Sequence, residues 1–175
     1  GILRDSCKCV IGNGLVVDLI GLMGELKALV ERGIRLENRL FISDRAHMVL
    51  QYHKELDGAK EGSREDGEKI GTTKRGIGPA YCDKADRTGL RLGDILEDDF
   101  LDLVKTQAEI KNKILVSMGA EPLDIATLQQ QVQEAADYLR PFICDTIPLL
   151  TSDLWKSKLI VHQCPVLSPE RIKLQ

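Results

Sequence analysis

The sequence predicts an α/β fold: a partial parallel sheet with helices, plus a helical hairpin insertion. Two patterns lead to this prediction. Residues 9–44 run strand, helix, strand, which is the order of a parallel α/β arrangement. Residues 98–118 and 123–142 are two long helical patterns separated by the short linker Gly119–Pro122, as in a helical hairpin. With 43% hydrophobic and 29% charged residues, the chain has the composition of a globular protein with a packed core.

The first helix is predicted from apolar spacing between two strand-like pieces and a cap. Residues 9–11 and 15–18 are short apolar runs on either side of Gly12-Asn13-Gly14, whose residue types favour a tight turn. Residues 19–32 repeat apolar side chains three and four apart, the period of an amphipathic helix. Gly33 follows as a C-terminal cap.

The middle of the chain is less regular. Residues 39–44 predict another short apolar strand, and residues 45–61 predict a helix with one apolar face. The polar stretch 61–68 predicts a mobile surface loop. Residues 69–91 show neither a helical nor a strand period.

The last third ends in weaker patterns after the hairpin. Residues 147–155 predict a short helix, residues 158–162 predict a strand, and residues 163–175 show no period.

The overall composition excludes several classes of protein. A net charge of −3 argues against a general polyanion binder. No apolar run approaches the roughly 20 residues that span a bilayer.

Five cysteines fit neither a disulfide framework nor a four-ligand zinc site, because they are odd in number and irregularly spaced. The chain opens at Gly1 without a basic segment followed by an apolar one. We therefore expect a reduced, cytoplasmic protein of one domain, or a fragment of a larger protein.

Residues 69–91 are the segment richest in chemistry. Six Lys and Arg against two Asp give it a local charge of +4 in an acidic chain. Glycines let backbone N–H groups approach an anion, threonine hydroxyls add donors, and arginine offers a planar fork to phosphate oxygens. The cations are Lys69, Lys74, Arg75, Lys84, Arg87 and Arg91.

Neither the P-loop spacing G-x-x-x-x-G-K-[ST] nor G-x-G-x-x-G occurs in this segment. From the residues alone, two interpretations stay open: a site for a phosphorylated small ligand, and a flexible, solvated basic loop. We also expect residues 62–75 to be mobile without ligand, because Ile70 is their only apolar anchor.

One stretch of this segment resembles a known family. Its sequence is Gly76-Ile-Gly-Pro-Ala-Tyr-Cys-Asp-Lys-Ala-Asp-Arg87, similar to the signature G-I-G-P-x-Y-x-x-K-x-x-R of adenylosuccinate synthetases. Gly71-Thr-Thr73 precedes it as in the family. Further resemblances in the same order are Cys9–Asp18 to V-I-G-N-G-V-V-V-D-P, Ile42–His47 to S-x-R-A-H and Tyr52–Asp57 to P-Y-H-x-x-L-D. The resemblance covers residues 1–150 and the middle of a longer family chain.

The resemblance implies a GTP-dependent ligase of AMP biosynthesis that joins IMP and L-aspartate with Mg²⁺. GTP phosphorylates O6 of IMP, and the aspartate amine then displaces the phosphoryl group. The resemblance also implies a cytoplasmic homodimer that binds neither nucleic acid nor membrane. Such chemistry needs cations and N–H donors around the transferred group.

The resemblance also assigns residues. Lys84 corresponds to the signature lysine of the active site, Thr73 to a contact with IMP, and Arg87 to an arginine that reaches the IMP phosphate of the neighbouring subunit. Weaker candidates for IMP contact are Gly71, Thr72, Arg75 and Arg91. No metal ligand is expected in this chain, because the main ligands of Mg²⁺ and GTP belong to family segments that the sequence lacks.

Several family features are absent from the sequence. The loop G-D-E-G-K-G-K with its catalytic Asp, the G-H-T segment with its catalytic His, and the guanine-recognising region are missing. Residues 158–175 form a divergent tail after a family-like part, residues 1–157. Leu19 and Gln51 replace the family's prolines. We therefore expect the 175-residue chain alone to be inactive.

Other candidates are weaker. We place His47 and His53 six residues apart on one helical segment, where a metal site lacks a third ligand. His53 is better explained as a buried or capping histidine, and Cys82 is a poor nucleophile candidate because the family position varies. Competing hypotheses are a catalytically silent fragment that binds a nucleotide phosphate or dimerises, and a generic α/β interaction domain.

Overall fold

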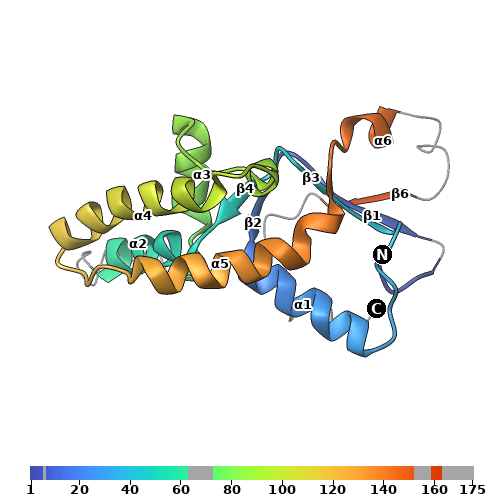
Figure 1. Cartoon of the computed structure of the whole chain (residues 1–175), viewed down its shortest axis with the longest axis horizontal. Helices are drawn as coiled ribbons and strands as arrows, with labels where there is room; N and C mark the ends of the chain where they lie inside the picture. Colours follow the sequence, from blue (N-terminus) through green and yellow to red (C-terminus); the bar gives the residue numbers. More distant parts are fainter. Residues whose placement is uncertain (6, 63–72, 152–158, 163–175) are drawn as a thin grey trace.

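The computed structural model describes residues 1–5, 7–62 and 73–151, and the backbone of residues 159–162. Several sequence expectations fall outside these residues: the loop over 63–68, Gly71 and Thr72, most of the mobile segment 62–75, the end of the helix predicted over 147–155, and the tail from 163. The described part is a mixed α/β structure in which the expected parallel strands and helical hairpin are both present (Figure 1).

Four parallel strands form the larger sheet. They are β1 (Lys8–Ile11), β3 (Leu40–Ser43), β5 (Ile143–Cys144) and β6 (Leu159–His162), in the order β5-β3-β1-β6. Cys9 pairs with Leu40 on one side of β1 and with Ile160 on the other. The strands predicted over 9–11, 39–44 and 158–162 are confirmed, and β5 was not predicted, because two residues are too few to show a period.

A second, two-stranded parallel sheet pairs β2 (Val16–Asp18) with β4 (His47–Val49). β4 lies in the segment predicted to be helical, so the prediction over 45–61 is wrong at its start. All three residues of β4 are buried, and a strand buried on both faces shows no alternation of apolar and polar residues. The helix begins later, as α2 (Gln51–Gly62).

The prediction for α1 (Leu19–Glu31) is confirmed. Asp18 caps its start, accepting a hydrogen bond from the Gly21 N–H at 3.2 Å, and Gly33 with φ 80° follows its end. Leu19 and Gln51 are the first residues of α1 and α2. The first position of a helix is where proline is best tolerated, and it is where the family has proline. Both helices begin here with another residue in its place.

The hairpin of α4 (Phe100–Ser117) and α5 (Ile125–Leu139) is also confirmed. Figure 1 shows the two helices side by side, with α2 behind them. Asp124 caps α5, and the Asn112 side chain exchanges hydrogen bonds with the backbone of Leu123. The remaining short helices are η1 (Leu92–Leu96), η2 (Arg140–Phe142) and α6 (Ile147–Thr151).

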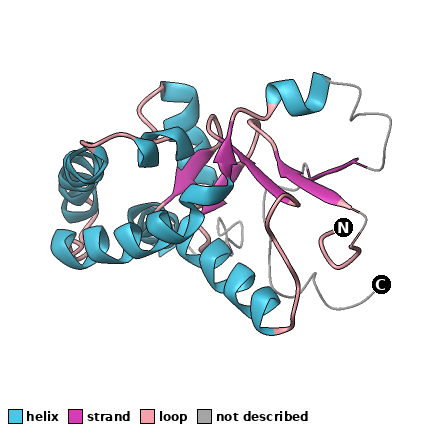
Figure 2. Ribbon diagram, turned by 45° about the vertical axis from the view of Figure 1, so that its right-hand side comes forward, coloured by secondary structure: helices cyan, strands magenta, loops and turns pink. Residues whose placement is uncertain are grey.

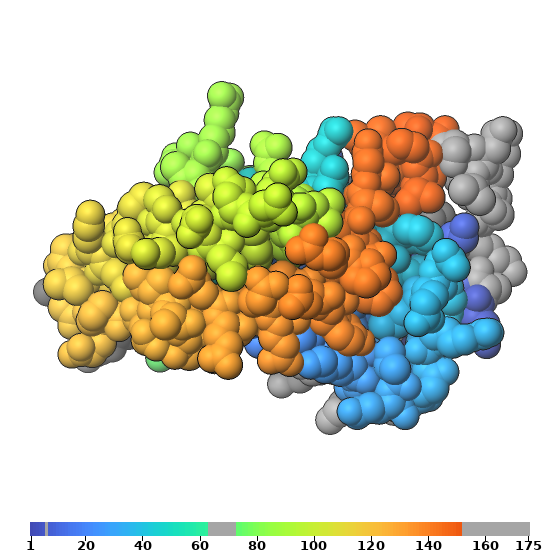
Figure 3. Space-filling model, in the orientation of Figure 1, coloured from blue at the N-terminus to red at the C-terminus, as the bar shows by residue number. Residues whose placement is uncertain are grey.

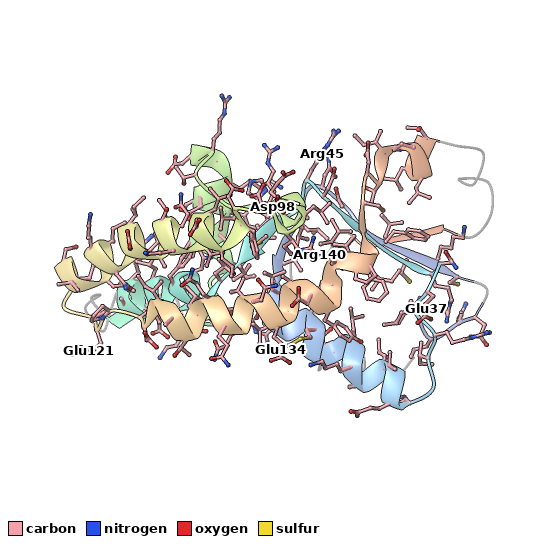
Figure 4. The ribbon with its side chains drawn as sticks, in the orientation of Figure 1. Glu37, Arg45, Asp98, Glu121, Glu134 and Arg140 are labelled. Atoms are coloured by element: carbon pink, nitrogen blue, oxygen red, sulfur yellow. The ribbon has the colours of Figure 1, made fainter. Side chains whose placement is uncertain are left out.

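One hydrophobic core joins the larger sheet, α1 and the hairpin, and in Figure 2 most of the helices lie to the left of and below the strands. Its centre contains Leu19, Ile42, Val104 and Leu139, each 0% exposed. α5 also packs along α1, where Lys27 and Glu134 form an exposed ion pair of 2.8 Å (Figure 4). The hairpin therefore belongs to the main body of the fold.

α3 (Ile77–Asp86) is a helix that the sequence did not predict. The segment shows no helical period in the sequence, but its Pro79 is in the first turn of the helix, where a backbone N–H has no helical partner. The buried face of α3 consists of Pro79, Ala80 and the charged residue Asp83. Ala80 packs with Val16 and Val49 and thus seats α3 on the smaller sheet.

Gly76 brings the start of α3 against α2. Its φ is 72°, and its N–H donates to the Asp57 carboxylate at 3.1 Å. A Cβ at this position would lie 2.7 Å from both the His53 carbonyl carbon and the Lys54 nitrogen. The close approach of α3 to α2 thus requires glycine on two grounds, conformation and space.

We predict that Gly76→Ala lowers the free energy of unfolding by roughly 1–3 kcal/mol, the cost of holding a residue with a side chain in the left-handed region. The matched control is Gly78→Ala, because nothing lies within 4 Å of a Cβ there. Alanine favours a helix over glycine, so the control should be neutral or stabilising by about 0.5–1 kcal/mol. Urea denaturation of the two variants checks this. Equal stabilities would contradict the close approach.

Candidate functional site

α3 and the loop between β1 and β2 form the centre of the candidate site. Lys84 Nζ donates to the Asn13 carbonyl oxygen at 2.7 Å, and the Tyr81 hydroxyl donates to the Gly14 carbonyl at 3.3 Å. The structure thus joins two motifs that are 71 residues apart in sequence. Sequence reasoning did not connect them, because the contacts are made to backbone carbonyls and leave no pattern in the sequence.

Lys84 is half-buried beside a second cation. Burial and the nearby Arg91 guanidinium lower the pKa of the Lys84 ammonium from its ordinary value of 10.5. An ammonium has three donors, and Asn13 takes one of them. Within the described residues, the other two find no acceptor, which suits an ammonium that meets an incoming anion.

Arg87 ends α3 in an unusual conformation. Its φ is 61°, in the left-handed region, and its side chain is exposed. In the described part of the chain, its guanidinium forms no ion pair with Asp83, Glu97 or any other acid. The segment that contains α3 projects from the upper edge of the molecule in Figure 3. Arg87 is therefore an exposed cation at the end of α3.

The remaining candidates do not all gather around Lys84. Arg91 does, since it is exposed and close enough to lower the pKa of Lys84. Thr73 is exposed just before α3 begins. Arg75 lies toward α1, where its charge acts on Glu25. Gly71 and Thr72 fall outside the described residues.

His47 lies beneath the two cations. It is 6% exposed, and its Nδ1 atom has no hydrogen-bond partner among the described residues. Burial, Lys84 and Arg91 together lower the pKa of its imidazole from 6.5, so His47 is a neutral side chain in the folded protein near neutral pH. Gly89 packs against it, since a Cβ there would lie 2.9 Å from His47 Cδ2.

The idea of a shared helix for His47 and His53 is wrong, because His47 belongs to β4 and only His53 belongs to α2. In the ranges 1–5, 7–62 and 73–151, no group of three or more His, Cys, Asp and Glu side chains could hold a metal ion. Cys82 is an exposed thiol on α3.

His53 is a buried, capping histidine, as predicted. Its Nδ1 accepts the N–H of Leu50 at 2.9 Å, just before α2 begins, and its Nε2 lies 3.1 Å from Asp83 Oδ2. Because Nδ1 accepts, Nε2 holds the proton and donates to Asp83. Burial lowers the pKa of His53 despite this carboxylate, so the ring is neutral in the folded protein.

Asp83 is the polar residue on the buried face of α3. Its Oδ1 accepts from Lys111 Nζ on α4 at 2.6 Å, and its Oδ2 accepts from His53. Burial alone would raise the pKa of the carboxyl, but the two donors and the Lys111 charge lower it overall. We call His53, Asp83 and Lys111 the Asp83 network; it joins α2, α3 and α4.

Sequence reasoning missed the Asp83 network, although one signal was present. Lys111 occupies the apolar face of α4, between Ala108 and Leu115, where a lone cation needs a buried partner. That signal does not identify the partner, which is 28 residues away. By contrast, the charged residues Lys105, Glu109 and Lys113 of α4 are exposed.

Cations lie on the outer side of α3. The buried acid on its inner side, Asp83, is already paired with His53 and Lys111. Lys84 and Arg91 lie close together, and Arg87 is exposed at the end of α3. Donors of this kind bind phosphate groups.

None of the described helices is long and apolar enough to cross a membrane.

Comparison with known proteins gives a consistent result. A family model described as adenylosuccinate synthetase matches residues 1–163. An adenylosuccinate synthetase of Caldicellulosiruptor saccharolyticus is 45% identical over 163 residues, which are 92% of this chain and 38% of the relative. A chloroplastic one of Ostreococcus lucimarinus is 43% identical over 84% of this chain and 34% of the relative.

Among solved structures, the fully ligated adenylosuccinate synthetase of Plasmodium falciparum is similar, with a TM-score of 0.78 and 30% sequence identity. The similarity covers 92% of this chain and 37% of that one. The chain thus spans less than two-fifths of the length of these relatives.

The two histidines with lowered pKa values predict how stability depends on pH. Each binds a proton more readily unfolded, near its ordinary pKa of 6.5, than folded. The free energy of unfolding should therefore be constant above about pH 7 and fall below about pH 6.5, by up to ~1.4 kcal/mol per pH unit for each histidine. His53→Gln should remove the part of this pH dependence that one histidine contributes.

Denaturant titrations between pH 5 and pH 8 check this prediction, with Lys105→Gln as a control on the exposed face of α4. Asp83 contributes little to the pH dependence in this range. Because its pKa is lowered from 3.8, the stability that it provides is lost mainly as the pH falls through 3.8 and below. If His53→Gln and the wild type lose stability with the same slope, His53 is not neutral in the folded chain.

Proposed function

The chain belongs to the adenylosuccinate synthetase family, and we propose that it forms the IMP-contacting part of an enzyme that joins IMP to L-aspartate at the expense of GTP. The observation that supports this most directly is the exposed cationic side of α3, where the family signature places Lys84 and Arg87. The product would enter AMP biosynthesis.

Lys84 acts at the active centre in this proposal. Phosphoryl transfer to O6 of IMP, followed by displacement by the aspartate amine, moves negative charge among oxygen atoms. A cation held at a fixed place by the Asn13 carbonyl favours that charge without having to reorganise. Thr73 would contact IMP, with Arg75 and Arg91, and with Gly71 and Thr72 outside the described residues, as further candidates.

Mg²⁺ and GTP would accompany the reaction, but the described residues offer no set of metal ligands. We therefore assign neither of them to a residue of this chain. The family-like part over residues 1–157, the divergent tail over 158–175 and a cytoplasmic location stay predictions. The homodimer is also a proposal, and the exposed Arg87 supports it, because in the family the corresponding arginine acts in the partner's IMP site.

The decisive measurement is GTP- and aspartate-dependent conversion of IMP, on this chain and on the full-length protein that contains it. We predict turnover by the full-length protein and none by the 175-residue chain. The catalytic Asp and His and the GTP loop of the family are absent from the chain, and a general acid or base typically contributes about 10²–10⁴-fold.

Turnover by the purified chain would contradict the second half of this prediction. An inactive full-length protein would overturn the proposed function and favour the alternative of a catalytically silent fragment that binds a nucleotide phosphate or dimerises. Binding of IMP without turnover would identify that alternative.

Arg87→Leu should weaken IMP binding by the full-length enzyme by roughly 1.5–3 kcal/mol, the value of a charge-assisted hydrogen bond. Lysine should not replace it fully, because only arginine pairs with phosphate through a planar fork. GTP binding should change little. Arg140→Leu is the matched control, since Arg140 is an exposed arginine at the end of α5 (Figure 4).

Because Arg87 acts in the partner's site in this proposal, mixing Arg87→Leu subunits with Thr73→Ala subunits should restore part of the activity through hybrid dimers. One of the two sites in such a dimer has both residues intact. Isothermal calorimetry and activity of the mixture provide the measurements. No recovery, together with correct dimer exchange, would show that Arg87 acts within its own chain.

A further inference from the structure

We propose that Asp83 is a positioning residue: the Asp83 network fixes the rotation of α3 and thereby the places of Lys84 and Arg87. The effect on IMP rests on the proposed function. The geometric claim, that α4 controls the loop between β1 and β2 through α3, does not. The side chains of the three network residues form no hydrogen bond to that loop in the described structure.

Burial makes the network a strong constraint. His53, Asp83 and Lys111 are 1%, 6% and 8% exposed. A buried carboxylate needs its partners, because losing one of them leaves an uncompensated charge without water. The two oxygens of Asp83 are taken by donors from two different helices, 2.6 Å and 3.1 Å away. Only one rotation of α3 about its axis satisfies both.

The apolar contacts of α3 seat the helix on the smaller sheet but are not directional. Pro79 and Ala80 are its buried apolar side chains, and the half-buried Ile77 and Tyr81 pack against the same cluster of Val16 and Val49. Apolar burial favours contact without specifying a direction, so it limits the rotation of α3 less sharply than hydrogen bonds do. Directed hydrogen bonds to a charged group have a preferred geometry that apolar contacts lack.

Asp83 also fixes the end of the helix through its backbone. Its carbonyl oxygen accepts the N–H groups of Thr88 at 3.0 Å and Gly89 at 3.1 Å. These bonds close the turn in which Arg87 adopts its left-handed conformation. One residue thus determines the direction of Lys84 through its side chain and the position of Arg87 through its carbonyl.

The test uses the full-length protein with three variants: Lys111→Met, Lys111→Arg and the double variant Asp83→Leu/Lys111→Met. The double variant removes both charges together, so it tests positioning without leaving an uncompensated buried charge. Lys111→Arg retains a cation that can still reach Asp83. Glu134→Gln, which breaks only an exposed ion pair on α5, is the control.

Two readouts are measured on each variant whose thermal unfolding stays cooperative. The first is the backbone amide chemical shifts of residues 12–15 and 84–89 by NMR spectroscopy. The second is kcat/KM for IMP and KM for GTP. We expect the double variant to shift the signals of both segments and to lower kcat/KM for IMP roughly 10–100-fold, as misplacement by about 1 Å does. KM for GTP should stay within about twofold, and Lys111→Arg should recover part of the loss.

A folded double variant with wild-type signals over residues 12–15 and wild-type IMP kinetics would overturn the proposal. A uniform loss in all kinetic constants with those signals unchanged would show a role in stability alone, and would overturn it too. If the wild-type protein does not convert IMP, the proposed function fails, and the amide signals alone decide whether Asp83 positions α3.

Discussion

A single buried carboxylate is the constraint on which the arrangement of α2, α3 and α4 depends. Asp83 receives a neutral imidazole from α2 and an ammonium from α4, and the charges cancel within the network. Since the histidine also caps α2 at Leu50, its ring cannot turn to serve one partner without losing the other. Three hydrogen bonds among six polar atoms thereby couple three helices and a cap.

This coupling explains how a ten-residue helix can hold its cations in fixed places. Hydrogen bonds of Asp83 to α2 and α4 hold the inner side of α3, as does the close contact of Gly76 with α2. The outer side of α3 faces the loop at Asn13. The pKa of Lys84 is lowered first by burial and then by the nearby charge of Arg91, so holding these two cations together is unfavourable. A rigid support is needed to hold such groups together until an anion arrives.

The sequence predicted those parts of the fold whose signal is periodic. α1, α4, α5 and three strands of the larger sheet follow from apolar spacing. β4 was missed because its residues are all buried, and α3 was missed because glycine, proline and a buried Asp83 hide its period. For the site, the signature led us to propose Lys84 and Arg87. The contacts of α3 with Asn13, His53 and Lys111 span long sequence separations, which a single sequence does not reveal.

The first residues of α1 and α2 have a consequence for folding kinetics. Proline at these places would restrict the unfolded chain and favour the native state by about 0.4–1 kcal/mol for each residue. It would also add a peptide bond that isomerises over tens to hundreds of seconds. With Leu19 and Gln51, the chain forgoes that entropic advantage, and both helices can begin on the time scale of backbone rotation. The entry into each parallel strand–helix unit is then never delayed by a wrong isomer at its first helical residue.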